Sequence, residues 1–244
     1  MRYGIISDIH SNLAALQRVL TALSDQDIDR YLCLGDIVGY AARPNECCEM
    51  IRDLDCLAVV GNHDLAACHA GSERFFTSAA RACILWTREV LAKDNRDFLA
   101  SLPAVLTVDG VELCHGSLAD PEAYITTPAA ALPSFGLMQQ QLCFFGHTHY
   151  AEWFVRAQDG KLPVHFSALA GAQAEIAQDT RYMVNPGAVG QPRDGNSQAS
   201  FAIWDTESRL LQIRRVGYDV ETTQRQIIEA GLPESQATRL LLGI

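Results

Sequence analysis

The stretch Cys143-Phe144-Phe145-Gly146-His147-Thr148-His149 is an apolar run that ends in two histidines one residue apart. A short apolar run that ends at a glycine is consistent with a buried strand. Residues i and i+2 of an extended segment point to the same side, so His147 and His149 can face one cavity. Neutral imidazoles commonly bind transition metals. The stretch predicts half of a metal site, provided that other segments supply partners, because an isolated His-x-His pair also fits an ordinary polar turn.

Four other segments place polar side chains at the ends of predicted strands. The strands are expected at residues 2–8, 30–36, 56–62 and 111–115, and the segments are Asp8-x-His10, Gly35-Asp36, Gly61-Asn62-His63-Asp64 and His115-Gly116. Strands that alternate with helices form mostly parallel sheets, whose ligands collect beyond the carboxyl ends of the strands. Alone, Asp36 or Asn62 is typical of a turn or a helix cap. Together with the histidine pair, the segments predict a metal centre.

The rest of the chain predicts an α/β protein with two packed sheets. Helices are expected after Ser11 or Asn12, from Pro44, from after Asn62 through about residue 100, at 129–141, and at 220–242. Within the third region an apolar stripe at helical spacing comprises Ala79, Ala82, Cys83, Trp86 and Val90. Asp109-Gly110 predicts a hairpin between residues 104–108 and 111–115. Short links after His149 predict a second, mostly antiparallel set of strands. No repeat or linker interrupts the pattern, so one domain over residues 1–244 is expected.

Composition and charge exclude several classes of function and predict where the protein is located. The chain has 244 residues, 48% of them hydrophobic, and its net charge of −10 speaks against binding a long nucleic acid. No run of about 18 uncharged apolar residues predicts a membrane span. The first residues lack the apolar stretch of a secretory signal, so a cytoplasmic location is expected. The eight cysteines form no Cys-x-x-Cys pair and are interpreted as reduced, mostly buried thiols. The sequence does not indicate an oligomeric state.

The residue types also indicate the chemistry. Mixed histidine and aspartate ligands suit manganese, iron, zinc and related divalent ions, and a bridging carboxylate can hold two ions about 3.5–4 Å apart. Two dications, two carboxylates and a hydroxide leave about one positive charge in excess, by simple addition of formal charges. Such a site would attract a phosphate ester, so a small phosphorylated substrate is expected.

In these five motifs the chain resembles the calcineurin-like metallophosphoesterase superfamily. Three later segments, Asn185-Pro186-Gly187, Gly190 to Gly195, and Val216-Gly217-Tyr218-Asp219, are similar to its small prokaryotic phosphoesterase branch. The resemblance implies one metallophosphoesterase domain with a four-layer α-β-β-α sandwich of two mixed sheets, a fold that some schemes class as α+β. It also implies two divalent metal ions, with manganese favoured and iron, zinc, nickel or cobalt as alternatives.

The resemblance further implies a role for each motif residue. One ion would be held by Asp8, His10, Asp36 and His149, and the other by Asp36, Asn62, His115 and His147. His63 would face the substrate without binding metal, and Asn62 would contact the substrate as well. Arg193 adds a candidate phosphate contact, because a guanidinium binds phosphate in bidentate fashion. Its alternative role is an ion pair with Asp194 or another acid.

At one motif the chain departs from the pattern of the protein phosphatases in this superfamily, and the departure narrows the expected activity. Protein serine/threonine phosphatases follow their Gly-Asp with Val-Asp-Arg-Gly, whereas this chain reads Val38-Gly39-Tyr40-Ala41. The missing aspartate and arginine speak against a protein phosphatase and leave open what orients His63. The expected activity is hydrolysis of a small phosphodiester, a nucleotide or a dinucleoside polyphosphate. A metal-bridging hydroxide would attack phosphorus, with His63 as general acid or electrostatic stabiliser. The alternative is a non-catalytic scaffold of the same fold, against which the complete ligand set argues.

Overall fold

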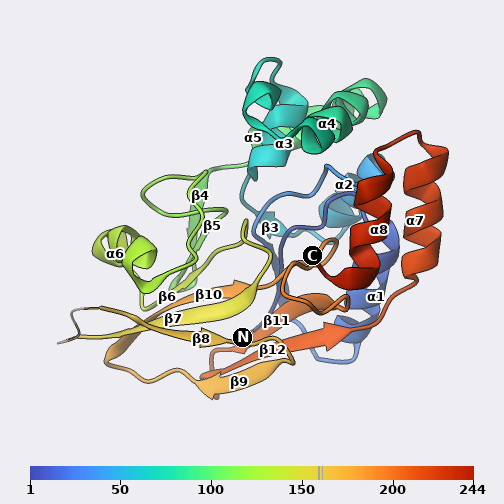
Figure 1. Ribbon diagram of the computed structural model, residues 1–244. Coiled ribbons are helices and arrows are strands. Elements are labelled where there is room, and N and C mark those ends of the chain that lie inside the picture. The colour runs from blue at the N-terminus through green and yellow to red at the C-terminus, as the bar shows by residue number, and fades with distance from the viewer. Residues whose placement is uncertain (159, 161) are drawn as a thin grey trace.

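The computed structural model describes residues 1–158, 160 and 162–244, and in it two mixed sheets of six strands pack together with helices outside (Figure 1). The strands are β1 (Arg2–Ile6), β2 (Arg30–Cys33), β3 (Leu57–Ala58), β4 (Val105–Val108), β5 (Val111–Cys114), β6 (Leu142–Phe144), β7 (Ala151–Ala157), β8 (Val164–Ser167), β9 (Ala172–Glu175), β10 (Thr180–Pro186), β11 (Ala199–Asp205) and β12 (Leu210–Val216). The α-helices are α1 (Leu13–Ser24), α2 (Pro44–Asp53), α3 (Asn62–Cys68), α4 (Ser78–Val90), α5 (Lys93–Ser101), α6 (Pro128–Leu137), α7 (Val220–Glu229) and α8 (Glu234–Leu242), and a 3-10 turn, η1, covers Ser72–Phe75.

Each sheet combines parallel and antiparallel strands. The first has the order β3-β2-β1-β11-β12-β9, in which β1, β2 and β3 are parallel. The second has the order β4-β5-β6-β10-β7-β8, in which β5, β6 and β10 are parallel. Consequently the carboxyl ends of five parallel strands, β1, β2, β3, β5 and β6, carry the segments singled out in the sequence. The predicted fold class is confirmed.

The core lies between the two sheets and between the first sheet and its helices. In β1, Tyr3 and Ile5 pack into the cluster between the sheets, whereas Ile6 joins the cluster under α1 and α2. The paired strand β11 alternates in the same way, with Trp204 facing the other sheet and Phe201 facing the helices. This alternation of period two buries both faces of the strands. Burying each such side chain contributes roughly 1.5–3 kcal/mol.

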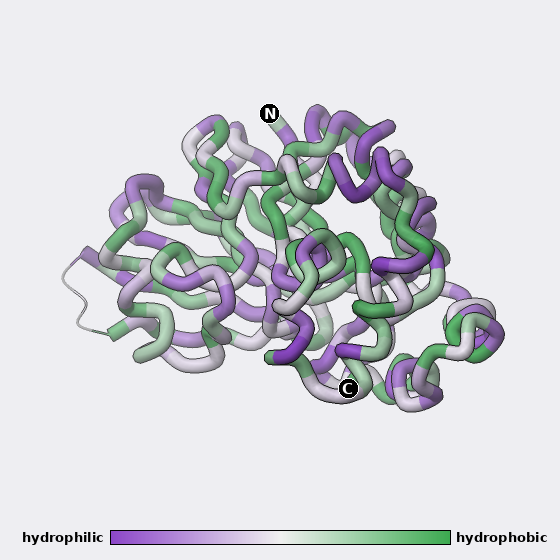
Figure 2. The backbone as a smooth tube through the Cα atoms, turned by 90° about the horizontal axis from the view of Figure 1, so that it is seen from above, coloured by the Kyte–Doolittle hydropathy of each residue, from purple (hydrophilic) through white to green (hydrophobic). Residues whose placement is uncertain are grey.

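Helices complete the outer layers. Helix α1 packs against α2, α7 and strand β11, while α6 covers β7 and β10 on the outer face of the second sheet (Figure 1). As predicted, Asn12 caps α1, and its Oδ1 accepts a hydrogen bond from Ala15 N at 3.2 Å. Helices α3, α4 and α5 lie together above the strand ends (Figure 1). In the described part of the chain, each helix is too short or too polar to cross a membrane, and Figure 2 shows short hydrophobic segments interrupted by hydrophilic ones.

The late strands pair mostly in antiparallel fashion, as expected, but they are divided between the two sheets. Strand β11 pairs with β1 and carries β12 in the first sheet, while β10, β7 and β8 extend the second sheet from β6. Other expectations about the elements were incomplete or wrong. Strand β9 was not predicted, and β3 spans only two residues. In α4 only Cys83 of the predicted stripe is fully buried, and the other buried side chains are Ala80, Ile84 and Thr87. Ala80 and Cys83 share a hydrophobic cluster with side chains of α7 and α8, which the sequence pattern of one helix does not reveal.

Candidate metal centre

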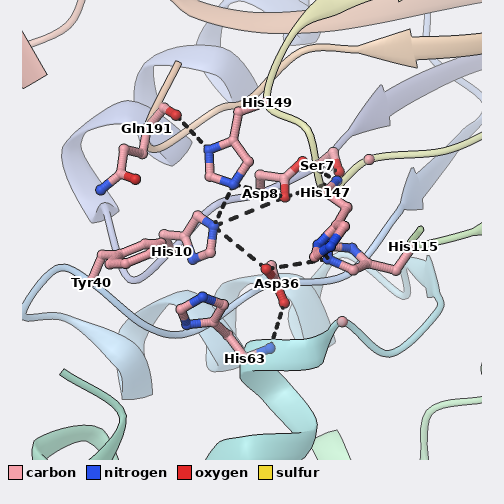
Figure 3. A network of polar contacts seen from close by, with 12 residues as sticks. Ser7, Asp8, His10, Asp36, Tyr40, His63, His115, His147, His149 and Gln191 are labelled. Atoms are coloured by element: carbon pink, nitrogen blue, oxygen red, sulfur yellow. Dashed lines mark hydrogen bonds and ion pairs between the residues drawn. The ribbon is translucent and has the colours of Figure 1, made fainter. Parts of the chain in front are cut away.

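The residues predicted as metal ligands converge beyond the strand ends, where the two sheets meet (Figure 3). They come from the loops after β1, β2, β5 and β6 and from the first residue of α3. Six of the seven side chains are almost completely buried and Asn62 is partly buried. The seven are Asp8, His10, Asp36, Asn62, His115, His147 and His149.

The first cluster contains Asp8, His10, Asp36 and His149. His149 Nε2 lies 3.3 Å from Asp8 Oδ1 and 3.1 Å from His10 Nε2. His10 Nε2 lies 3.6 Å from Asp36 Oδ2. Four potential donor atoms therefore surround one point, as the sequence resemblance implied for the first ion.

The second cluster shares Asp36 with the first. Its centre is His115 Nε2, which lies 3.3 Å from Asp36 Oδ2, 3.1 Å from His147 Nδ1 and 3.1 Å from Asn62 Oδ1. The same oxygen of Asp36 thus faces both clusters. The other oxygen, Oδ1, accepts the backbone N–H of His63 at 2.8 Å, which fixes the rotation of the carboxylate.

The imidazoles are oriented by backbone carbonyls. In each of the four histidines the ring nitrogen that points away from the clusters lies at hydrogen-bond distance from a carbonyl oxygen: His10 from Val38 at 3.1 Å, His115 from Leu34 at 2.7 Å, His147 from Glu122 at 3.1 Å and His149 from Gln191 at 2.6 Å. Because that nitrogen must donate, the other nitrogen of a neutral ring carries its lone pair toward the cluster. The lone pairs of His10 and His149 then face each other at 3.1 Å, an arrangement that a cation between them would stabilise. The donor set fits two divalent ions.

The loops that carry these side chains adopt an unusual backbone conformation. Positive φ angles occur at Asp8 (52°), His10 (50°), Asp36 (53°), His147 (68°) and His149 (63°). The left-handed region is unfavourable for residues other than glycine, at a cost of order 1–3 kcal/mol each. The expectation that His147 and His149 point to one side of an extended segment was therefore wrong in its geometry. Both lie in a left-handed turn, and each side chain enters a different cluster.

Hydrogen bonds that were not predicted hold the turn after β6. Asn185 Nδ2 donates to Gly146 O at 2.8 Å and to Thr148 Oγ1 at 2.9 Å, and Ser7 Oγ donates to Asp8 Oδ2 at 2.7 Å. A Cβ on Gly146 would lie 2.1 Å from Ser7 Oγ, so the two loops touch only because this residue is glycine. The Asn-Pro-Gly segment indicated a loop in the sequence, but not which turn that loop would hold.

His63 lies beside both clusters and is held by aromatic packing. Its ring centroid is 4.5 Å from that of Tyr40, 4.8 Å from that of His10 and 4.9 Å from that of Phe76. A Cβ on Gly39 would lie 2.5 Å from His63 Nδ1. In place of an orienting carboxylate, the chain therefore has a glycine that lets the ring approach and a tyrosine that packs on it. Among the described residues Nδ1 is buried without a hydrogen-bond partner, which leaves Nε2 as the ring nitrogen for a substrate.

Asp64 connects the loops without entering either cluster. Its Oδ1 accepts the backbone N–H of Val38 and its Oδ2 that of Gly61, each at 3.0 Å. Asp64 thus joins the loop after β2 to the start of α3. Burial, together with the charge of Asp36, raises the pKa of Asp64 to about 7.

A cavity of about 470 Å³ opens beside the clusters. Its wall includes Asn62, His63 and Arg193, the three predicted substrate contacts. Among the described residues Arg193 has no acidic partner, because Asp194 pairs with Arg215 instead. The ion-pair alternative for Arg193 is therefore not realised. The tyrosine ring of Tyr124 lies on His147, with centroids 3.9 Å apart, at the edge of the same cavity.

The pKa values of the four histidines in the clusters are shifted in two opposite directions. Burial lowers the pKa of His147 to about 3, with a further contribution from His115, and burial likewise holds the pKa values of His10 and His149 well below the ordinary value. His115 differs. Burial also disfavours its charge, but Asp36, Asp8 and the Leu34 carbonyl together outweigh burial and raise the pKa of His115 to about 10. Without metal, a proton on His115 therefore neutralises Asp36, whose own pKa is held well below its usual range.

We expect metal binding at pH 7.5 to release at least one proton per chain, since His115 must give up its proton to become a ligand and a metal-bound water that ionises would add to the release. The other three imidazoles are already neutral at this pH. Because the pKa of His115 is raised from 6.5 to about 10, its contribution to the stability of the metal-free protein is full below pH 6.5 and is lost as the pH rises toward 10. Metal affinity should rise over the same interval. Titration calorimetry in two buffers of different ionisation enthalpy measures the proton release, and equal heats in both buffers would contradict it.

The two histidines of the turn should differ when each is replaced. His149→Ala removes a donor from the first cluster only, and His147→Ala from the second only. Each variant should retain about one ion per chain under conditions that saturate the parent protein at two, because structural ligands act mainly on their own ion. Elemental analysis after gel filtration measures the ratio. Loss of both ions in both variants would show that the clusters are not separable.

The chain is similar to known proteins over nearly its whole length. The model of the calcineurin-like phosphoesterase superfamily domain matches residues 1–209. An uncharacterised protein of Methanocaldococcus jannaschii is 40% identical over 245 aligned positions, which cover 98% of this chain and 97% of the relative. The crystal structure of a metallophosphoesterase from Sphaerobacter thermophilus is similar over 100% of both chains, with a TM-score of 0.86 and 39% identity. A hypothetical protein from Pyrococcus horikoshii shares the fold, with a TM-score of 0.79 and 21% identity over 100% of this chain and 98% of its own.

Proposed function

Because the chain belongs to the calcineurin-like phosphoesterase superfamily, we propose that it is a metal-dependent phosphohydrolase that cleaves a small phosphoester. The candidate substrates are a phosphodiester, a nucleotide and a dinucleoside polyphosphate. The observation that carries the proposal is the shared Oδ2 atom of Asp36, around which two complete donor sets converge. Manganese is the favoured metal, since mixed histidine and carboxylate donors suit it, as they suit iron, zinc, nickel and cobalt.

Two bound divalent ions would polarise a phosphoryl oxygen and lower the pKa of a water molecule so that it becomes nucleophilic near neutral pH. The chain supplies binding and orientation. The Asn62 amide lines the cavity next to His115 and can donate a hydrogen bond to a phosphoryl oxygen. Arg193 brings a guanidinium to the same cavity, where it can bind phosphate through two parallel N–H groups.

His63 is proposed to assist the departure of the leaving group. Burial lowers the pKa of His63 to about 4, so the ring is neutral at pH 7 in the free protein. A phosphate bound beside the ring would raise this pKa, because a nearby negative charge favours the imidazolium form. His63 Nε2 can then hold a proton toward the leaving oxygen while Tyr40 and Phe76 keep the ring in place.

A hydrolysis panel tests the proposal. Protein loaded with Mn²⁺ is incubated with bis-p-nitrophenyl phosphate, p-nitrophenyl phosphate and diadenosine tetraphosphate, and product formation is compared with protein treated with a chelator. We expect turnover of at least one substrate that is lost on chelation and restored by Mn²⁺. No turnover of any of the three, together with no bound metal, would instead favour a non-catalytic scaffold of the same fold.

A further inference from the structure

One end of the cavity carries two guanidinium groups, more positive charge than one reacting phosphate group beside two metal ions requires. Arg193 comes from the loop after β10 and Arg239 from α8, and both line the cavity together with Tyr40. Arg193 Nη2 donates to Tyr40 Oη at 3.1 Å and to Gln191 Oε1 at 3.0 Å. Its Cζ atom lies 5.6 Å from the centroid of the Tyr40 ring. The tyrosine thus positions a cation that is distant from it in the sequence.

Neither guanidinium group pairs with an aspartate or glutamate side chain of the described residues. Arg193 Nε is buried without a hydrogen-bond partner, which is rare for a buried polar atom. Arg239 donates from Nε to Ile244 O at 2.5 Å, and its Nη atoms have no hydrogen bond within the described chain. Burial and the charge of Arg193 lower the pKa of Arg239, which indicates that the two guanidinium groups lie close enough to repel each other.

This end of the cavity is next to the first cluster but separate from it. The Tyr40 ring lies between, with its centroid 4.5 Å from that of His10 and 4.5 Å from that of His63. On the side of the second cluster the cavity is lined instead by Glu122 and Tyr124. The cations therefore lie at one end only, so a substrate with a second negative charge would have a preferred orientation across the clusters.

We propose that Tyr40, Arg193 and Arg239 form a second phosphate subsite, and that the substrate carries at least two phosphate groups. One group would react at the metal clusters and the other would bind here. The placement of the reacting group rests on the proposed function, whereas the subsite rests on the two arginines that pair with no aspartate or glutamate side chain of the described residues. Phosphate fits them better than carboxylate does, because its three terminal oxygens can accept from two guanidinium groups at once.

Binding of three matched, non-hydrolysable anions to the Mn²⁺-loaded protein tests the subsite. They are methylphosphonate, methylenebisphosphonate and phosphonoacetate, measured by titration calorimetry at a fixed concentration of free Mn²⁺. We expect methylenebisphosphonate to bind at least about tenfold more tightly than methylphosphonate, because one charge-assisted hydrogen bond suffices for that ratio. In Arg239→Gln and, separately, in Arg193→Gln, the ratio should fall to about threefold or less.

Arg225→Gln is the matched control. Arg225 lies exposed on α7 and donates to Thr222 Oγ1, outside the cavity, so its variant should keep the ratio of the parent protein. An unchanged ratio in both cavity variants would overturn the subsite, as would the absence of any preference in the parent protein. Phosphonoacetate binding as tightly as methylenebisphosphonate would overturn the assignment to phosphate. Because binding is measured without turnover, a failed hydrolysis panel would count against the proposed function and leave this test intact.

Discussion

His63→Ala should lower kcat by about 10²- to 10⁴-fold while the protein still binds two ions per chain. The reason is that His63 lines the cavity, whereas its ring packs edge-on against His10 and, among the described residues, forms no hydrogen bond or ion pair with the carboxylates of the clusters. The ring is also not needed to place Asp36, which is held by the backbone N–H of residue 63. Steady-state kinetics with the best substrate of the panel, combined with elemental analysis, measures both quantities.

His69→Ala is the control for this variant. His69 directly follows α3, is exposed to solvent, and lies away from both clusters, so its loss should change kcat by less than about twofold, as for an ordinary surface substitution. Activity of His63→Ala equal to that of the parent protein would contradict the assigned role. A loss of activity that is accompanied by loss of metal would mean instead that His63 supports the clusters.

Asp36→Asn should remove both ions and abolish turnover. One carboxylate oxygen serves both clusters, and the neutral amide that replaces it is isosteric but removes the negative charge that the two ions would share. The loss of affinity should exceed the about 10- to 100-fold that removal of an outer partner of a ligand typically costs. Metal content is measured by elemental analysis after dialysis against Mn²⁺ at a concentration that saturates the parent protein.

The metal-free state of this variant provides an independent check. Without the Asp36 charge, the pKa of His115 should fall from about 10 toward a value below 6.5, because burial alone disfavours the imidazolium. An NMR titration of the metal-free variant measures this pKa directly. Asp53→Asn, at an exposed position on α2, should behave as the parent protein in both measurements. Retention of two ions by Asp36→Asn would show that the carboxylate does not bridge them.

The candidate ligands could be predicted from sequence because their signal is local. Asp8, Asp36 and His115 each follow an apolar strand, and the carboxyl ends of parallel strands meet at one edge, so residue type and position together indicated a metal centre. The hairpin at Asp109-Gly110 was predictable for the same reason, since both residues adopt the positive φ that this turn requires.

The features that escaped prediction depend on contacts between distant segments. The carbonyl partners of the histidines belong to residues of any type, so no side-chain pattern marks Val38, Leu34 or Gln191. The contact between Tyr40 and Arg193 joins residues 153 positions apart and appears only after the loops fold together. The pairing of β11 with β1 could not be predicted either. Both faces of these strands are buried, so no alternation of polar and apolar residues marks them, and the lengths of the connecting loops do not show which strand pairs with which.

The most direct test of the dinuclear centre is the anomalous scattering of a crystal of the protein grown with Mn²⁺. We expect two peaks per chain, about 3.5–4 Å apart, with Asp36 Oδ2 within bonding distance of both. One peak should lie among Asp8, His10 and His149, and the other among Asn62, His115 and His147. A single peak, or two peaks that Asp36 does not join, would contradict the account.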